Sequence, residues 1–165
     1  MGSGKSSVGE KLAKVLRIPF LDLDSEIEKA EEISISRIFS EKGEIYFRKI
    51  ENQVLKKVLV LPNNFVLATG GGTPCYGDSM EYISKQENVV SVYLKAPLKT
   101  LVSRLTLEKD KRPLLNHLNS EILLEDFIKK HLFERAFYYN QATVTIDVAS
   151  ESIAETVEKI VLKLF

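Results

Sequence analysis

Hydrophobic positions along the chain alternate between long segments with a spacing of three or four residues and short runs rich in β-branched residues. The pattern over Lys5 to Leu16 predicts an amphipathic helix with Val8, Leu12 and Val15 on one face. Further helical patterns cover residues about 25–60, 97–107 and the C-terminal end. Short strands are predicted at 18–22, 65–68, 89–94 and 144–147.

Local signals place the boundaries of several of these elements. Ser34 is a candidate helix cap, Gly43 is expected to interrupt the helical pattern, and Pro97 opens a helix. Ser150 or Ser152 is expected to cap the last helix. Strands separated by helices predict a parallel sheet with right-handed crossovers, hence an α/β sandwich whose ligands bind beyond the carboxyl ends of the strands.

Composition and charge narrow the function classes. The 165 residues suit one compact domain, predicted to span 1–165. Lys+Arg and Asp+Glu both number 23, which argues against a nucleic acid held by bulk charge. No apolar run reaches membrane-spanning length, and Cys75 is the one cysteine, which excludes an internal disulfide. We therefore expect a cytoplasmic protein with no nucleic-acid or membrane partner, and a monomer.

The segment Gly2-Ser3-Gly4-Lys5-Ser6 matches the end of a P-loop. Glycines allow backbone N–H groups to surround phosphate oxygens, and the following helix directs the positive end of its dipole at the same anion. Lys5 would bridge the β- and γ-phosphates of ATP, and the Ser6 hydroxyl would bind Mg²⁺. Ser7 completes the predicted ATP-binding segment. The alternative is a flexible glycine- and serine-rich terminus without a ligand.

The first glycine of the P-loop pattern would fall two residues before Met1, and no strand precedes the loop. In P-loop folds the first strand normally lies in the centre of the sheet, so its loss would leave neighbouring backbone groups unpaired. We therefore expect Met1 to be an internal methionine of a protein that begins several residues earlier with an apolar strand.

Candidate acceptor-binding residues follow two of the predicted strands. Strand alternation is expected to put the carboxylates of Asp22 and Asp24 on the same side of the backbone, where one would support Mg²⁺ through water and the other would hold a substrate hydroxyl. The alternative is a strand-end aspartate followed by a helix cap at Asp24. Three consecutive glycines, Gly70, Gly71 and Gly72, indicate either a close approach of the backbone to another group or a tight turn.

Three arginines are candidates for anion binding. Arg48 and Arg135 lie in helical patterns and would suit a bidentate grip on one carboxylate, although each could also be a surface arginine and their spacing alone does not pair them. Arg112 lies in the segment 109–119, which lacks periodicity and is predicted to be a mobile flap. An arginine brought close to the P-loop can neutralise the charge of a transferring phosphoryl group.

In order and spacing, these segments resemble the shikimate kinase family. The resemblance rests on Gly2 to Ser6, on Asp22 and Asp24, on Gly43-Glu44 with Phe47-Arg48 and Glu51, on Gly70 to Gly72, on Arg112 to Leu115, and on Arg135 with Tyr139. It covers almost the whole chain. It implies a nucleoside-monophosphate-kinase-like three-layer α/β/α sandwich, with a substrate-binding insert at about 25–61 and a lid at about 108–121.

The same resemblance implies a reaction, namely ATP-dependent phosphorylation of the 3-hydroxyl of shikimate in aromatic amino acid biosynthesis, with ATP and shikimate as ligands and Mg²⁺ as cofactor. It implies catalytic roles for Lys5, Asp24 and Arg112 and, through water, a metal contact for Asp22. The shikimate site would comprise Asp24, Phe39, Phe47, Arg48, Gly70, Gly71, Gly72 and Arg135, and Arg104 would stack on adenine.

Two rival functions remain open at this point. The chain could be another small P-loop kinase, of the gluconate or nucleoside-monophosphate type, but a nucleobase acceptor would not need two arginines converging on a carboxylate. It could instead be a nucleotide-binding regulator, which would hold or hydrolyse ATP regardless of shikimate. A panel of acceptor substrates discriminates between these readings.

Overall fold

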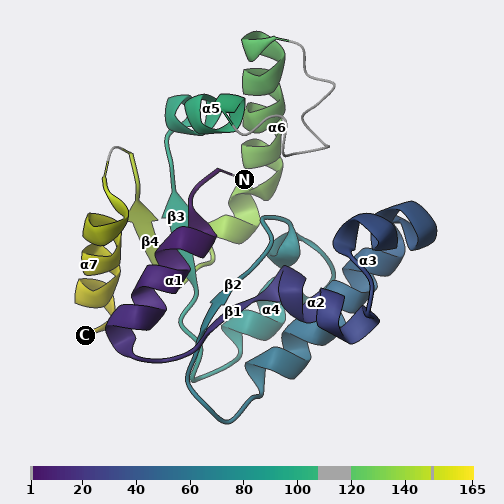
Figure 1. Cartoon of the computed structure of the whole chain (residues 1–165). Coiled ribbons are helices and arrows are strands. Elements are labelled where there is room, and N and C mark those ends of the chain that lie inside the picture. Colours follow the sequence, from purple (N-terminus) through teal and green to yellow (C-terminus); the bar gives the residue numbers. More distant parts are fainter. Residues whose placement is uncertain (1, 108–119, 150) are drawn as a thin grey trace. The chain divides into compact units, whose positions relative to one another are not determined.

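The computed structural model describes residues 2–107, 120–149 and 151–165, and these residues form two compact units (Figure 1). One unit runs from Lys5 to Ser91, and the other holds residues 2–4 and the described residues from Val92 to Phe165. The predicted lid and Arg112 fall largely or wholly outside the described residues.

The Lys5–Ser91 unit contains two strands and most of the predicted acceptor site. Its elements are α1 (Lys5–Leu16), β1 (Phe20–Asp22), α2 (Leu23–Glu31), α3 (Ile35–Leu59), β2 (Val66–Ala68), the 3₁₀ helix η1 (Thr73–Cys75) and α4 (Ser79–Ser84). β1 and β2 are parallel, with Phe20 opposite Val66 and Asp22 opposite Ala68. Asp22 is the last residue of β1 and the glycine run follows β2, so both lie at the carboxyl ends of neighbouring parallel strands.

A hydrophobic core joins α2 to both halves of α3. It comprises Leu23, Ile27, Ile38, Phe47, Val54, Leu55 and Val58. Ser34 caps α3 by accepting a hydrogen bond from the backbone N–H of Arg37, as predicted. Gly43 has φ 81° and ψ 172°, so the helical path is broken there, which confirms the predicted interruption.

The other unit contains β3 (Val92–Lys95), α5 (Leu98–Leu107), α6 (Glu121–Tyr139), β4 (Val144–Asp147) and α7 (Ile153–Leu164). β3 and β4 are parallel, from Val92 opposite Val144 to Lys95 opposite Asp147. Of the two serines proposed to cap α7, Ser152 has this role, since it forms a capping box with Glu155.

The α/β class with parallel strands is confirmed, and each predicted strand shares residues with an observed one. The observed strands are shorter than predicted at three of the four positions, and α4 was not anticipated. None of the described helices combines the length and apolar character that crossing a membrane requires. The division into one domain with an insert and a lid remains a prediction.

Candidate active site

The start of the P-loop segment has backbone geometry that favours glycine. Gly2 has φ 68° and Gly4 has φ 83°, in the left-handed region, and α1 begins directly afterwards at Lys5. The Nη1 atom of Arg104, on α5, donates a 3.3 Å hydrogen bond to the carbonyl oxygen of Gly2. Arg104 thus lies next to the predicted phosphate loop, consistent with its predicted place in the ATP site. Its contact with adenine remains a prediction.

Ser6 and Asp22, the two predicted metal-site residues, lie within reach of each other. The Ser6 hydroxyl donates to Oδ2 of Asp22 over 3.4 Å. Asp22 Oδ1 also accepts a 3.0 Å hydrogen bond from the backbone N–H of Asp24 and so caps α2. The helix cap is therefore Asp22, not Asp24, and Asp24 lies in the first helical turn rather than in an extended segment. The expectation that strand alternation aligns the two carboxylates was wrong.

The carboxyl group of Asp24 is surrounded by other acidic groups. Desolvation raises its pKa above the ordinary value, and the negative charges of Asp22, Glu51 and Glu28 raise it further, while Lys5 opposes them. Asp24 is nevertheless an exposed residue, so solvent limits the size of these effects. A carboxylate with a raised pKa is a stronger base, which suits a group that accepts a proton from an attacking hydroxyl.

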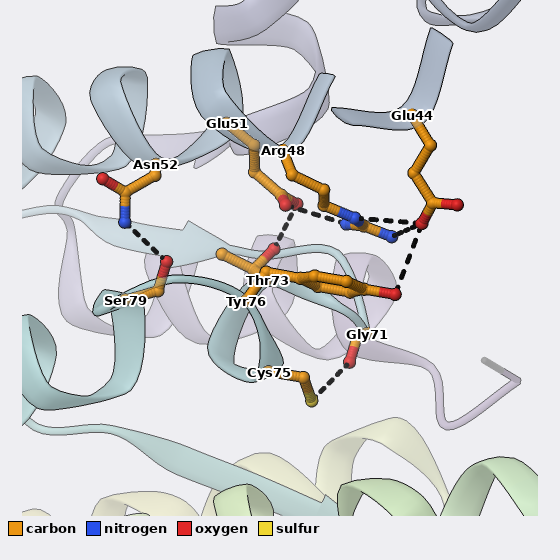
Figure 2. A network of polar contacts seen from close by, with 9 residues as sticks. All are labelled: Glu44, Arg48, Glu51, Asn52, Gly71, Thr73, Cys75, Tyr76 and Ser79. Atoms are coloured by element: carbon orange, nitrogen blue, oxygen red, sulfur yellow. Dashed lines mark hydrogen bonds and ion pairs between the residues drawn. The ribbon is translucent and has the colours of Figure 1, made fainter. Parts of the chain in front are cut away.

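Arg48 is anchored through a buried carboxylate. Its Nη1 donates a 2.8 Å hydrogen bond to Oε2 of Glu51, whose other oxygen accepts a 2.7 Å hydrogen bond from the Thr73 hydroxyl (Figure 2). Glu51 and Thr73 are 2% and 0% exposed, so both partners of the arginine's anchor are fixed in the protein interior. Desolvation lowers the pKa of Arg48, but the hydrogen bond and charge of Glu51 outweigh it, and the net change is upward.

The glycine run passes close to these polar side chains. A Cβ atom on Gly72 would lie 2.9 Å from both Nη1 and Nη2 of Arg48. A Cβ atom on Gly70 would lie 3.3 Å from Oε1 of Glu51 and 3.9 Å from Oδ1 of Asp24. The close approach predicted for this run is therefore confirmed at both positions. The run brings Asp24 and Arg48 into one neighbourhood.

Two predicted aromatic residues pack together across the break in α3. The rings of Phe39 and Phe47 lie 4.5 Å apart between centroids, on opposite sides of Gly43 in the sequence. Phe47 is buried, whereas Phe39 is 40% exposed. This arrangement is consistent with the predicted wall of the acceptor pocket, which remains a prediction.

Arg135 lies on α6, in the other compact unit, and is half-buried rather than fully exposed. Its convergence with Arg48 on one carboxylate remains a prediction. The Cys75 thiol donates a 4.0 Å hydrogen bond to the carbonyl oxygen of Gly71. The predicted roles of Lys5, Ser3 and Ser7 rest on their positions in the loop and at the start of α1.

Four residues around Arg48 were not predicted to have a role. Thr73 and Tyr76 follow the glycine run, and Glu44 and Glu51 lie one turn before and after Arg48 on α3. The spacing of Arg48 and Glu51, three residues apart on a helix, is a signal for an ion pair. No comparable signal in the sequence links Thr73 or Tyr76 to Arg48, because the link depends on how the glycine run folds back.

The donors at Ser6 and Asp22 fit Mg²⁺. This cation prefers hard oxygen ligands, keeps several waters and is usually held by one or two protein oxygens plus substrate phosphates. Among the described residues, no group of three or more His, Cys, Asp or Glu side chains is placed to hold a metal. A hydroxyl and a single carboxylate beside a phosphate loop are what such a shared site requires.

Comparisons with known proteins agree on one family. The family model described as shikimate kinase matches residues 1–165. A curated shikimate kinase of Flavobacterium johnsoniae is 46% identical over 160 residues, which are 97% of this chain and 92% of that protein.

Solved structures give the same result. The crystal structure of shikimate kinase from Bacteroides thetaiotaomicron has a TM-score of 0.90 and 34% identity, and covers 99% of this chain and 93% of its own. Shikimate kinase from Acinetobacter baumannii in complex with shikimate has a TM-score of 0.85 and 33% identity, with 99% and 88% coverage.

Proposed function

Because this chain belongs to the shikimate kinase family, it is a kinase, and we propose that it transfers the γ-phosphoryl group of ATP to the 3-hydroxyl of shikimate. The products would be ADP and shikimate 3-phosphate, within the biosynthesis of aromatic amino acids. The observation that carries this proposal is that, in one compact unit, the carboxylate of Asp24 and the guanidinium group of Arg48, which the buried Glu51 anchors, lie beside the same glycine run.

The two residues suit the two ends of the acceptor. Shikimate has a carboxylate on its ring and hydroxyl groups away from it. Arg48 would bind the carboxylate through the N–H groups that Glu51 leaves available, and Arg135 would add a second cation. Asp24 would accept a hydrogen bond from the attacking hydroxyl and take its proton as the new P–O bond forms. Gly70, Gly71 and Gly72 would lie along the ring, with Phe39 and Phe47 beside it.

The phosphate side would be held by the loop and the start of α1. The backbone N–H groups of Gly2, Ser3 and Gly4 would cradle the phosphates, Lys5 would bridge the β- and γ-phosphates, and Arg104 would adjoin the nucleotide. Mg²⁺, when bound, would neutralise charge on the phosphate oxygens. Ser6 would be its ligand, and Asp22 would orient a bound water. Arg112, outside the described residues, would neutralise the transferring group.

Phosphoryl transfer depends more on positioning and charge stabilisation than on covalent help from the protein. We expect the protein to act as a cytoplasmic monomer on these two small molecules, with Mg²⁺ as its cofactor. These assignments rest on the family membership and on the donor types at the site.

The decisive experiment measures ADP formation in the presence of Mg²⁺ with shikimate, gluconate, a nucleoside monophosphate or no acceptor. Turnover that requires shikimate and disappears in Lys5→Met and on addition of EDTA supports the proposal. Turnover that is indifferent to shikimate, in protein shown to be folded by circular dichroism, contradicts the acceptor assignment and favours a nucleotide-binding regulator.

A further inference from the structure

We propose that Tyr76 is a positioning residue for the carboxylate of the acceptor, because its ring fixes the plane of the Arg48 guanidinium group. The inference rests on the proposed function, since it assumes that Arg48 binds the shikimate carboxylate. Tyr76 lies directly after η1, beyond the glycine run, and comes from a different segment of the chain than Arg48.

The contact is close and of the stacking kind. The guanidinium carbon of Arg48 lies 4.0 Å from the centroid of the Tyr76 ring, compared with 5.1 Å from the ring of its neighbour Phe47. Figure 2 shows the tyrosine ring edge-on beneath the guanidinium group, with the two planes running alongside each other. An aromatic face attracts a cation at this distance without using any of its N–H donors.

Stacking leaves the N–H groups at the edges of the guanidinium group available, and these groups are needed to bind the ligand. Glu51 takes one donor on Nη1 with a 2.8 Å hydrogen bond. Oε1 of Glu44 lies 3.4 Å from both Nε and Nη2, at the outer limit of hydrogen bonding, and the Glu44 side chain is 56% exposed. A substrate carboxylate can therefore displace Glu44 at modest cost, while the Glu51 contact persists. The ring of Tyr76 keeps the plane in place during this exchange.

The hydroxyl group of Tyr76 has a different contact. It donates to Oε1 of Glu44 over 3.3 Å, the same oxygen that contacts the edge of Arg48 (Figure 2). This bond is long, and it connects to a carboxylate that the substrate would displace. The ring, not the hydroxyl, therefore carries the proposed role, and phenylalanine at this position should preserve it.

The test compares steady-state kinetics of the wild-type protein with those of Tyr76→Phe and Tyr76→Leu. Leucine occupies part of the same space without a π face. We expect Tyr76→Leu to raise KM for shikimate about three- to tenfold, the range that the loss of a partly exposed cation–π contact predicts. Its kcat and its KM for ATP should stay near the wild-type values, and Tyr76→Phe should resemble the wild type throughout.

A matched control and a changed substrate separate positioning from general structure. Tyr82→Leu removes a tyrosine of α4 whose ring faces Lys56 at 5.2 Å instead of Arg48, and it should leave KM for shikimate unchanged. With the carboxamide analogue of shikimate, which lacks the negative charge, the kcat/KM ratio of wild type to Tyr76→Leu should fall towards one. If Tyr76 had a purely structural role, Tyr76→Leu would lower kcat/KM equally for shikimate and for the carboxamide.

Three results would overturn the inference. The first is a wild-type KM for shikimate in Tyr76→Leu, and the second is an equal rise in this KM in Tyr76→Phe and Tyr76→Leu. The third is a loss of kcat/KM in Tyr76→Leu that is as large with the carboxamide as with shikimate. Tyr76 is 38% exposed, so folding should tolerate the change, and Tyr76→Met provides a second variant without the ring. Failure of the wild-type protein to phosphorylate shikimate would instead contradict the proposed function itself.

Discussion

The hydroxyl group of Thr73 donates a 2.7 Å hydrogen bond to Oε1 of Glu51, and both residues are buried. This bond joins the loop after the glycine run to α3, the helix that carries Arg48. Its two ends are 22 residues apart in sequence, so it fixes a tertiary relationship and not a local one. The carboxylate of Glu51 then has one oxygen satisfied by Thr73 and the other by Arg48.

Substitution of Thr73 by valine keeps the shape of the side chain but removes the donor. The buried oxygen of Glu51 then loses its partner, and we expect the free energy of unfolding to fall by about 1–3 kcal/mol. KM for shikimate should also rise, because Glu51 orients Arg48. Urea denaturation and steady-state kinetics measure both effects. Thr73→Ser, which retains the hydroxyl, is the control, and equal stability of the two variants would contradict the prediction.

Alanine at Gly72 should affect binding more than stability. Gly72 has φ −87° and ψ −20°, which alanine adopts readily, but its Cβ would lie 2.9 Å from Nη1 and Nη2 of Arg48. The long arginine side chain can shift to relieve this clash. We therefore expect a higher KM for shikimate with little change in melting temperature.

Gly70→Ala provides the comparison for Gly72→Ala. Its Cβ would meet Oγ1 of Thr73 at 3.1 Å and Oε1 of Glu51 at 3.3 Å, and both of these residues are buried and hydrogen-bonded to each other. We expect this variant to lower the melting temperature as well as substrate affinity. Thermal unfolding of both variants, recorded with their kinetics, should show that difference, and a larger loss of stability in Gly72→Ala would refute the argument.

Replacement of Asp24 by asparagine tests the proposed base. The amide keeps a hydrogen-bonding group but takes up no proton, so kcat should fall by about a hundred- to ten-thousand-fold. Glu26→Gln, in the same helical turn, removes a half-buried carboxylate that pairs with the exposed Lys29 and should leave kcat unchanged. An Asp24→Asn variant with near-normal kcat would show that proton removal by this group is not needed.

Gly43 should resist substitution for reasons of backbone geometry. Its φ of 81° and ψ of 172° lie in a region that side chains with a Cβ rarely occupy. A Cβ there would have no heavy atom within 4 Å, so any loss of stability in Gly43→Ala comes from strain and not from a clash. We expect a loss of about 1–3 kcal/mol in the free energy of unfolding. An unchanged free energy would mean that the helix break moves without cost.

A contact near this break should make stability depend on pH. Hydrogen bonds from Lys42 and from the Tyr46 hydroxyl, both 2.8 Å, hold the pKa of Glu31 below its ordinary 4.5. A lowered pKa in the folded state stabilises the protein above the ordinary value, and this contribution disappears as pH falls through the lowered value.

Glu31→Gln tests this dependence. Its melting temperature should lie below that of the wild type near neutral pH, and the difference should shrink as the pH falls below about 4.5, where Glu31 gains its proton. Glu41→Gln, which breaks an exposed pair with Arg37, should show a smaller difference at neutral pH. A difference for Glu31→Gln that is independent of pH would contradict the assignment.

Periodicity and local signals were enough to predict several boundaries. The helix at Lys5–Leu16, the cap at Ser34 and the break at Gly43 were all predicted from sequence alone, because each depends on residues within one or two helical turns. The family resemblance was also confirmed, since it rests on the order of short motifs. The alternative that placed the cap of α2 at Asp24 was wrong, because Asp22 and Asp24 are equally good caps and the end of β1 decides between them.

The sequence by itself thus determined the α/β class, the family and the identity of the candidate residues. Tertiary structure alone decided that Thr73 and Tyr76 support Arg48, Thr73 through Glu51 and Tyr76 directly. Both come from the segment after β2, and their contacts depend on the path of the glycine run. Hydrophobic spacing records which side of an element is buried, but it carries no information about which distant side chain lies there, since that follows from how the elements pack.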